Sequence, residues 1–135
     1  MSSTSRRGFL QTAAVTGAGF WVAGTAAANL SPRSPNEKLR IAGIGVGGKG
    51  RSDIEQASKL GDVVAICDID DNNVDAAFKT LNKEDKHNPK KFFDFRKMLE
   101  AEGKNIDAVV VSTPDHTHAV AAIMAMKMGK HVYCQ

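Results

Sequence analysis

Cysteine is scarce in this sequence of 135 residues, and that scarcity excludes one class of protein at the outset. Two cysteines cannot supply the disulfide framework on which small secreted domains depend. Internal repeats and low-complexity tracts are absent as well. The length is sufficient for one domain.

Excess charge of either sign is nearly absent. The chain carries 18 Lys and Arg residues against 15 Asp and Glu residues, a formal charge of +3. Arg6 and Arg7 lie in an N-terminal segment discussed below, and without them the count is 16 against 15, or +1. This balance gives no reason to expect nucleic acid or an anionic membrane surface as a partner.

A long uninterrupted apolar run is the third absence. The most apolar stretch covers residues 9–28, but three glycines and polar residues such as Gln11, Thr12 and Thr25 interrupt it. A helix that spans a membrane needs about 20 predominantly apolar residues. We therefore expect no stable membrane span, although a retained N-terminal anchor is the competing interpretation.

A twin-arginine pattern is present instead, in Ser5-Arg6-Arg7-Gly8-Phe9-Leu10. It resembles the twin-arginine translocation signal S-R-R-x-F-L-K and departs from it at Gln11, where lysine is usual. Three alanines at positions 26–28 supply an A-x-A cleavage site. We predict that residues 1–28 are a signal peptide for the twin-arginine export machinery, that residues 29–38 are a linker, and that the protein is periplasmic.

Glycines follow the first apolar run of the domain, which covers residues 39–44. Gly45, Gly47 and Gly50 fit the pattern G-x-G-x-x-G between a strand and a helix. The first glycine allows a tight turn, the second lets backbone approach a pyrophosphate, and the third lets the helix pack against the strand. The helix would begin near Lys49 and direct its unpaired N–H groups at the phosphates.

Three other interpretations use the same residues. Gly43, Gly45 and Gly48 also fit the pattern, but that register shortens the strand. Residues 43–50 approach a P-loop, yet Gly50 stands where that loop needs a hydroxyl for Mg²⁺. A glycine-rich surface loop without a ligand is the third interpretation.

An acid at the end of the next apolar run favours dinucleotide binding over these rivals. Asp68 ends the run of residues 62–68 and comes 18 residues after Gly50. The dinucleotide pattern places an acid about 20 residues beyond the glycines, where it binds the ribose hydroxyls. Asp68 could instead cap the next helix. With Asp70 and Asp71 close behind it, Asp68 also predicts a preference for NAD over NADP, because the extra phosphate of NADP would meet negative charge.

The rest of the chain alternates between predicted strands and helices, which indicates an α/β fold with a right-handed, doubly wound parallel sheet in the order 3-2-1-4-5. The strands are expected at residues 39–44, 62–68, 92–93, 106–112 and 131–135, and the helices at residues 52–60, 73–81, after Asp94, and at about 119–128. Cys67 and Cys134 fall on the second and fifth strands. Three strand spacings separate these strands by roughly 14 Å, so we predict that the two cysteines stay unpaired.

Several side chains outside the glycine region carry their own expectations. Ile54, Ala57 and Leu60 share one face of the first helix and should face the core. His87 lies in a polar loop without a partner at ligand spacing and should be solvated. His116 and His118 look like a metal pair by type, but no third ligand is evident, so we expect no metal. We expect three phenylalanines to lie in the core rather than to stack on bases, namely Phe92, Phe93 and Phe95.

Five segments together resemble the Gfo/Idh/MocA oxidoreductase family, named for glucose–fructose oxidoreductase and inositol dehydrogenase. They are I-G-V-G-G-K-G-R, I-C-D-I-D, F-F-D-F-R-K-M-L, V-V-V-S-T-P-D-H-T-H and G-K-H-V-Y-C-Q. The resemblance implies an NAD(P)-binding Rossmann domain at residues 39–135 and NAD(P)-dependent oxidation of a sugar, polyol or related hydroxyl compound. It also implies that Thr113 and Pro114 wall the nicotinamide side of the site and that His118 lies near it.

The sequence departs from the family at its last residue. Gln135 stands where the family has the glutamate of E-K-P, whose lysine is catalytic, and the family's second domain, built on an antiparallel sheet, is absent. We therefore expect the Rossmann domain to be incomplete and assign no catalytic residue in this chain, which should be inactive by itself. A non-catalytic dinucleotide sensor or partner-binding module is the alternative, and a homo-oligomer of the full-length protein remains open. The predicted cofactor-binding residues are Gly45, Val46, Gly47, Gly48, Lys49, Gly50, Asp68, Ser112, Thr113, Pro114 and His118.

Overall fold

A five-stranded parallel sheet forms the centre of the domain. The computed structural model describes residues 37–135, so the predicted signal peptide and most of the predicted linker lie outside the described residues. The strand order is β3-β2-β1-β4-β5 and every neighbouring pair is parallel, which confirms the predicted fold class and order. The strands are β1 (Leu39–Ile44), β2 (Gly61–Cys67), β3 (Lys90–Phe92), β4 (Ala108–Val111) and β5 (His131–Cys134).

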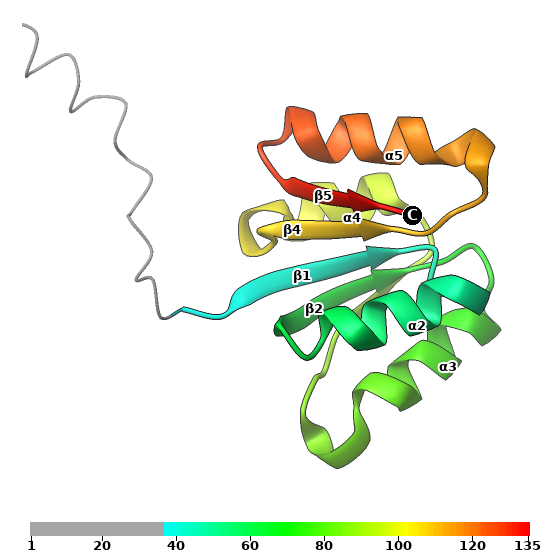
Figure 1. The fold of residues 1–135 in the computed structure, drawn as a ribbon, viewed down its shortest axis with the longest axis vertical. Helices are drawn as coiled ribbons and strands as arrows, with labels where there is room; N and C mark the ends of the chain where they lie inside the picture. The colour runs from blue at the N-terminus through cyan, green and yellow to red at the C-terminus, as the bar shows by residue number, and fades with distance from the viewer. Residues whose placement is uncertain (1–36) are drawn as a thin grey trace, which may run out of the picture. The chain divides into compact units, whose positions relative to one another are not determined.

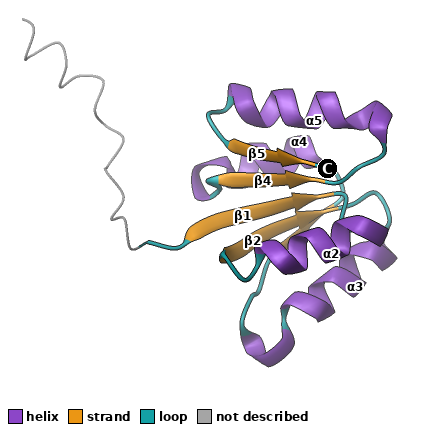
Figure 2. Cartoon of the chain, in the orientation of Figure 1, coloured by secondary structure: helices purple, strands orange, loops and turns teal. Residues whose placement is uncertain are grey.

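Helices cover both faces of this sheet (Figures 1 and 2). α2 and α3 pack on one face, and α4 and α5 pack on the other, as expected for right-handed crossovers on either side of the central strand β1. The helices are α2 (Gly48–Ala57), α3 (Asp71–Leu81), α4 (Phe95–Glu102) and α5 (Asp115–Lys127), with short 3₁₀ turns at Lys83–Asp85 and Gly103–Asn105.

Consecutive strand residues supply two separate hydrophobic clusters, because their side chains alternate between the two faces. Val109 and Val111 belong to the cluster beneath α4 and α5, whereas Val110 belongs to the cluster beneath α2 and α3. Such near-continuous apolar runs are typical of parallel strands that are covered on both sides. Burial on both faces fixes the register of the strands. Because the strands are parallel, their carboxyl ends meet at one edge of the sheet.

The starts of the helices differ from the sequence prediction. α5 begins at Asp115, four residues before the predicted start, directly after Pro114. The sequence predicts a loop for the polar run after this proline, but Pro114 serves as the N-cap and Asp115 places a favourable negative charge in the first helical turn. α3 begins at Asp71 because the Asp70 side chain accepts a hydrogen bond from the Asn72 N–H and caps the helix.

Two of the predicted core residues are exposed. Leu60 is 79% exposed, because α2 ends at Ala57 and the next three residues form the turn into β2. Phe93 is 64% exposed, because β3 ends at Phe92 and leaves the next residue at the carboxyl edge of the sheet. Phe92 and Phe95 are partly buried against the core, as predicted.

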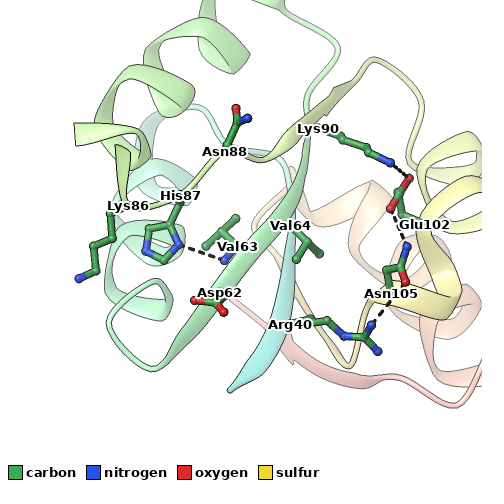
Figure 3. A pocket seen from close by; sticks show the side chains of 10 residues that line it. All are labelled: Arg40, Asp62, Val63, Val64, Lys86, His87, Asn88, Lys90, Glu102 and Asn105. Atoms are coloured by element: carbon green, nitrogen blue, oxygen red, sulfur yellow. Dashed lines mark hydrogen bonds and ion pairs between the residues drawn. The ribbon is translucent and has the colours of Figure 1, made fainter. Parts of the chain in front are cut away.

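His87 is buried, which contradicts the prediction that it is solvated. Only 6% of the residue is exposed, and its Nδ1 accepts a hydrogen bond of 3.4 Å from the Val63 N–H (Figure 3). The loop before β3 folds back against the amino end of β2, so the imidazole satisfies a backbone donor at the start of that strand. Local polarity in the sequence gave no sign of this long-range contact.

Both cysteines are free, as predicted. Cys67 is buried at the carboxyl end of β2, and Cys134 is exposed on the edge strand β5. Within residues 37–135, no helix combines the length and the apolar content that crossing a membrane requires.

Candidate functional site

The turn between β1 and α2 closes tightly and tolerates no side chain at two of its glycines. Gly45 adopts a φ of +78°, a conformation that L-residues rarely adopt, and a Cβ there would lie 2.8 Å from the Ser112 carbonyl oxygen. A Cβ at Gly50 would lie 1.8 Å from the Gly45 carbonyl oxygen. By contrast, a Cβ at Gly48 would meet nothing within 4 Å. These contacts favour the register Gly45–Gly47–Gly50 over the register that begins at Gly43, which lies inside β1.

Asp68 connects the end of β2 to this turn. Its Oδ2 accepts hydrogen bonds from the backbone N–H groups of Val46 at 2.9 Å and Gly47 at 3.0 Å. Its Oδ1 accepts a hydrogen bond of 3.0 Å from the Asp70 N–H and lies 3.5 Å from Asn73 Nδ2. The carboxylate therefore fixes the shape of the turn and is itself held in place at the edge of the sheet.

The amino end of α2 has no side-chain cap. Its N-cap is Gly47, whereas Asp70 and Asp94 cap α3 and α4 with their own carboxylates. The first N–H groups of a helix have no partner within the helix and attract anions. The start of α5 also lacks a side-chain cap, so the closely packed glycine turn is what distinguishes α2. An uncapped helix after such a turn suits a phosphate group.

A cavity of about 680 Å³ lies at the carboxyl ends of the strands, beside the glycine turn. Its walls come from the segments that follow β1, β2, β3 and β4, so four loops far apart in sequence enclose one space. Its lining residues are Ile44, Gly45, Gly47, Cys67, Asp68, Ile69, Asp70, Asn73, Phe93, Phe95, Ser112, Thr113, Pro114, His116 and Thr117. A crevice at this edge is where open parallel sheets bind ligands.

His118 lies at the start of α5, beside this cavity rather than in its wall. Its Nδ1 is 3.5 Å from Thr113 Oγ1, and its Nε2 contacts the Gln135 carbonyl oxygen at the end of β5. The Pro114 carbonyl raises the pKa of His118 above its usual value, and the Gln135 carbonyl and the Asp115 charge act in the same direction, while burial opposes them. The ring connects the loop after β4 to the end of the next strand.

The structure brings most of the predicted site residues together, although in different roles. Gly45, Gly47, Asp68, Ser112, Thr113 and Pro114 line the cavity. Val46 contributes its backbone N–H, while its side chain is buried beneath α2. Gly48 and Gly50 belong to the first turn of α2, and Lys49 is ion-paired with Asp53 on the same helix instead of reaching into the cavity.

Sequence analysis missed several residues of the site. Ile69 and Phe93 flank the cavity and are 80% and 64% exposed, a feature that the position directly after a strand could have indicated. Asn73 packs beneath Gly47, where a Cβ would lie 2.4 Å from its Nδ2. Asp53 is buried behind the glycine turn and gave no signal beyond its four-residue spacing from Lys49.

Comparison with known proteins gives a consistent result. Residues 39–135 match the family described as an oxidoreductase family with an NAD-binding Rossmann fold, GFO_IDH_MocA. The chain is 37% identical over 144 residues to a glycosyl hydrolase family 109 protein of Solibacter usitatus, an alignment that covers 98% of the chain and 32% of that protein. It is 31% identical over 157 residues to the alpha-N-acetylgalactosaminidase of Shewanella oneidensis, covering 100% of the chain and 34% of that protein.

A solved structure agrees with the fold. The structure of a probable dehydrogenase from Thermotoga maritima superposes with a TM-score of 0.58 and 29% identity, covering 71% of this chain and 27% of that one. The chain thus spans about a third of the length of the curated relatives it matches.

Proposed function

Because this chain belongs to the GFO_IDH_MocA oxidoreductase family and forms its NAD-binding Rossmann domain, we propose that it holds NAD for the oxidation of a hydroxyl group on a sugar, polyol or related compound. The observation that supports this most directly is the cavity at the carboxyl edge of the sheet, which joins the glycine turn to Asp68 on one side and to Thr113 and Pro114 on the other. Bound NAD supplies a hydride acceptor.

The residues of the site fit the parts of a dinucleotide. The backbone of residues 45–50 and the uncapped start of α2 suit the pyrophosphate, because a Cβ at Gly50 would fill the space that lets the helix approach. Asp68 would accept hydrogen bonds from the adenosine ribose, and its position at the cavity edge supports this assignment. Ser112, Thr113 and Pro114 border the opposite part of the cavity, where the nicotinamide would lie, and His118 supports that loop.

Charge at the ribose end favours NAD over NADP. Asp68, Asp70 and Asp71 follow one another closely at the end of β2, and a phosphate on the ribose would face them. One unit of like charge at about 5 Å, with an effective dielectric constant near 20, costs roughly 3 kcal/mol. Screening by solvent reduces this cost, so we expect at least tenfold discrimination, about 1.4 kcal/mol.

Isothermal titration of the full-length protein with NAD and with NADP tests the cofactor site. We expect wild-type protein to bind NAD at least tenfold more tightly and Asp68→Asn to reduce that ratio, since the variant keeps the size of the side chain and removes its charge. Asp62→Asn is the matched control and should leave the ratio unchanged, because Asp62 lies at the amino end of the same strand and does not line the cavity. Equal affinities in wild type, or an unchanged ratio in Asp68→Asn, would remove Asp68 from the role.

The glycosyl hydrolase family 109 relatives support a second candidate function, cleavage of a glycosidic bond. Hydrolysis of a glycoside consumes no oxidant, so any NAD reduced during the reaction must be oxidised again within the same turnover. The two functions therefore differ in whether NADH accumulates. Full-length protein incubated with NAD and either free sugars or an aryl glycoside distinguishes them by absorbance at the NADH band and by release of the aryl alcohol. NAD binding without either signal would support the non-catalytic module.

Export by the twin-arginine route is proposed on the sequence of residues 5–10 and on the alanines before Asn29. That route carries folded proteins, so a nucleotide-binding domain can take up its cofactor before it leaves the cytoplasm. Replacing Arg6 and Arg7 together by lysine should keep the protein in the cytoplasm, because the export receptor reads the pair. Fractionation of cells that express each form decides the matter, and normal levels of the variant outside the cytoplasm would refute the route.

A further inference from the structure

Asp53 is a buried carboxylate behind the glycine turn. It lies in the middle of α2, is 8% exposed, and accepts a hydrogen bond of 2.9 Å from Ser112 Oγ at its Oδ2. Its Oδ1 is ion-paired with Lys49, one helical turn earlier. A carboxylate is costly to bury, and aspartate is a poor residue for a helix interior. Packing alone would be served better by an apolar side chain of similar size.

Ser112 connects Asp53 to the glycine turn. The backbone of Ser112 lies against Gly45, where a Cβ would be 2.8 Å from its carbonyl oxygen, and its own Cβ is 3.0 Å from the position that a Cβ would take at Gly50. Ser112 also lines the cofactor cavity directly before Thr113. The hydrogen bond to Asp53 therefore holds a residue that touches the turn on one side and the cavity on the other.

Lys49 connects the same carboxylate to the start of α2. The lysine belongs to the first helical turn, whose N–H groups face the pyrophosphate position, and its side chain is 58% exposed while that of Asp53 is 6% exposed. The ion pair thus connects the first turn of α2 to the middle of the same helix. One carboxylate joins the two segments between which the phosphates would lie.

We propose that Asp53 is a positioning residue of the dinucleotide site, which sets the spacing between the β1–α2 turn and the end of β4 through Ser112 and Lys49. Asp53 does not line the cofactor cavity. This proposal rests on the cofactor assignment above.

The test measures NAD affinity and thermal unfolding of the full-length protein for Asp53→Ala and Asp53→Asn, at a temperature where every variant is folded. We expect Asp53→Ala to weaken NAD binding about tenfold, equivalent to about 1.4 kcal/mol. Asp53→Asn keeps an acceptor for Ser112 and loses the charge facing Lys49, so its loss of affinity should be smaller.

Glu102 supplies a matched control. It is also a buried acid, 7% exposed, and is paired with a lysine, Lys90, and with Asn105 (Figure 3). It lies near the amino ends of the strands, at the opposite edge of the sheet from the cofactor cavity. Glu102→Ala should lower the unfolding temperature, as Asp53→Ala does, and leave NAD affinity within twofold of wild type.

A double mutant tests whether Asp53 affects NAD binding through Ser112. If Asp53 acts partly through Ser112, the loss of affinity from Asp53→Ala should shrink in a Ser112→Ala background. Wild-type binding with unchanged affinity in both Asp53 variants would overturn the proposal and leave the cofactor assignment intact. Failure of wild type to bind NAD would overturn the cofactor assignment itself. An undiminished effect of Asp53→Ala in the Ser112→Ala background would refute the connection through Ser112.

Discussion

Among single residues, Gly50 and Gly48 differ sharply in what a methyl group would meet. Gly50→Ala would place its Cβ 1.8 Å from the Gly45 carbonyl oxygen, so the helix must move away from the turn. We expect this variant to lose measurable NAD binding and to be destabilised by about 2 kcal/mol or more. In Gly48→Ala the new methyl group meets no atom within 4 Å, but the φ of +46° costs about 1 kcal/mol. Gly48→Ala should keep most of its NAD affinity in isothermal titration. Equal losses of NAD affinity in the two variants would contradict the steric explanation.

Cys67 shows how the environment of one residue suppresses its chemistry. Burial raises the pKa of this thiol to about 12, and the negative charges of Asp68 and Asp94 contribute in the same direction. Its thiolate fraction at pH 8 is therefore on the order of one in ten thousand, and the thiolate is the reactive form.

Labelling of the folded protein with iodoacetamide at pH 8 should modify the exposed Cys134 and spare Cys67, as read by mass spectrometry of peptides. Denaturant should make both cysteines reactive, since the thiol then regains an ordinary pKa near 8.5. Rapid modification of Cys67 in the native state would show that the carboxyl end of β2 opens to solvent.

At the scale of elements, His87 connects the loop before β3 to β2. Its Nδ1 accepts the Val63 N–H, so in the neutral ring the proton is on Nε2, which has no hydrogen-bond partner among residues 37–135. His87→Ala leaves the Val63 N–H buried without this acceptor, and we expect a loss of about 1–3 kcal/mol in unfolding free energy by urea titration.

The neighbouring Lys86 provides the control for that measurement. Lys86 is exposed, so Lys86→Ala should change the unfolding free energy by less than about 0.5 kcal/mol. Both variants should keep wild-type NAD affinity, because this loop lies at the amino edge of the sheet. If His87→Ala leaves the unfolding free energy unchanged, water must replace the imidazole as the acceptor for the Val63 N–H.

The elements and the glycine turn could be predicted because their determinants are local. The apolar runs marked every strand to within two residues, and the spacing of Gly45, Gly47 and Gly50 was enough to place the turn. The positions of His87 and Asp53 could not be predicted, since their hydrogen bonds reach residues 24 and 59 positions away. Phe93 was assigned to the core because hydrophobicity alone does not show where a strand ends.

On the scale of the whole molecule, the cofactor cavity exists only when the sheet is complete. Gly45, Asp68 and Thr113 follow three different strands and meet only in the folded domain, so NAD should bind the folded state alone. NAD at about 100 times its dissociation constant should then raise stability by about 2.7 kcal/mol.

Thermal unfolding of the full-length protein checks this coupling. The midpoint should rise by several degrees with NAD, and NADP at the same concentration should give about half the stabilisation, about 1.4 kcal/mol, if it binds tenfold more weakly. An unshifted midpoint under conditions where titration shows binding would mean that NAD contacts a part of the protein that unfolds separately.

The uncapped start of α2 has a consequence for local motion. α3 and α4 begin under the carboxylates of Asp70 and Asp94, whereas the first turn of α2 has only the glycine turn before it. In this turn the Gly50 N–H already donates to the Gly47 carbonyl oxygen. Without a ligand, the amide hydrogens of Gly48 and Lys49 should therefore exchange with deuterium much faster than those at the starts of the capped helices. Bound pyrophosphate would act as the missing cap, so the slowing of deuterium uptake in this single turn should follow the fraction of protein that carries cofactor.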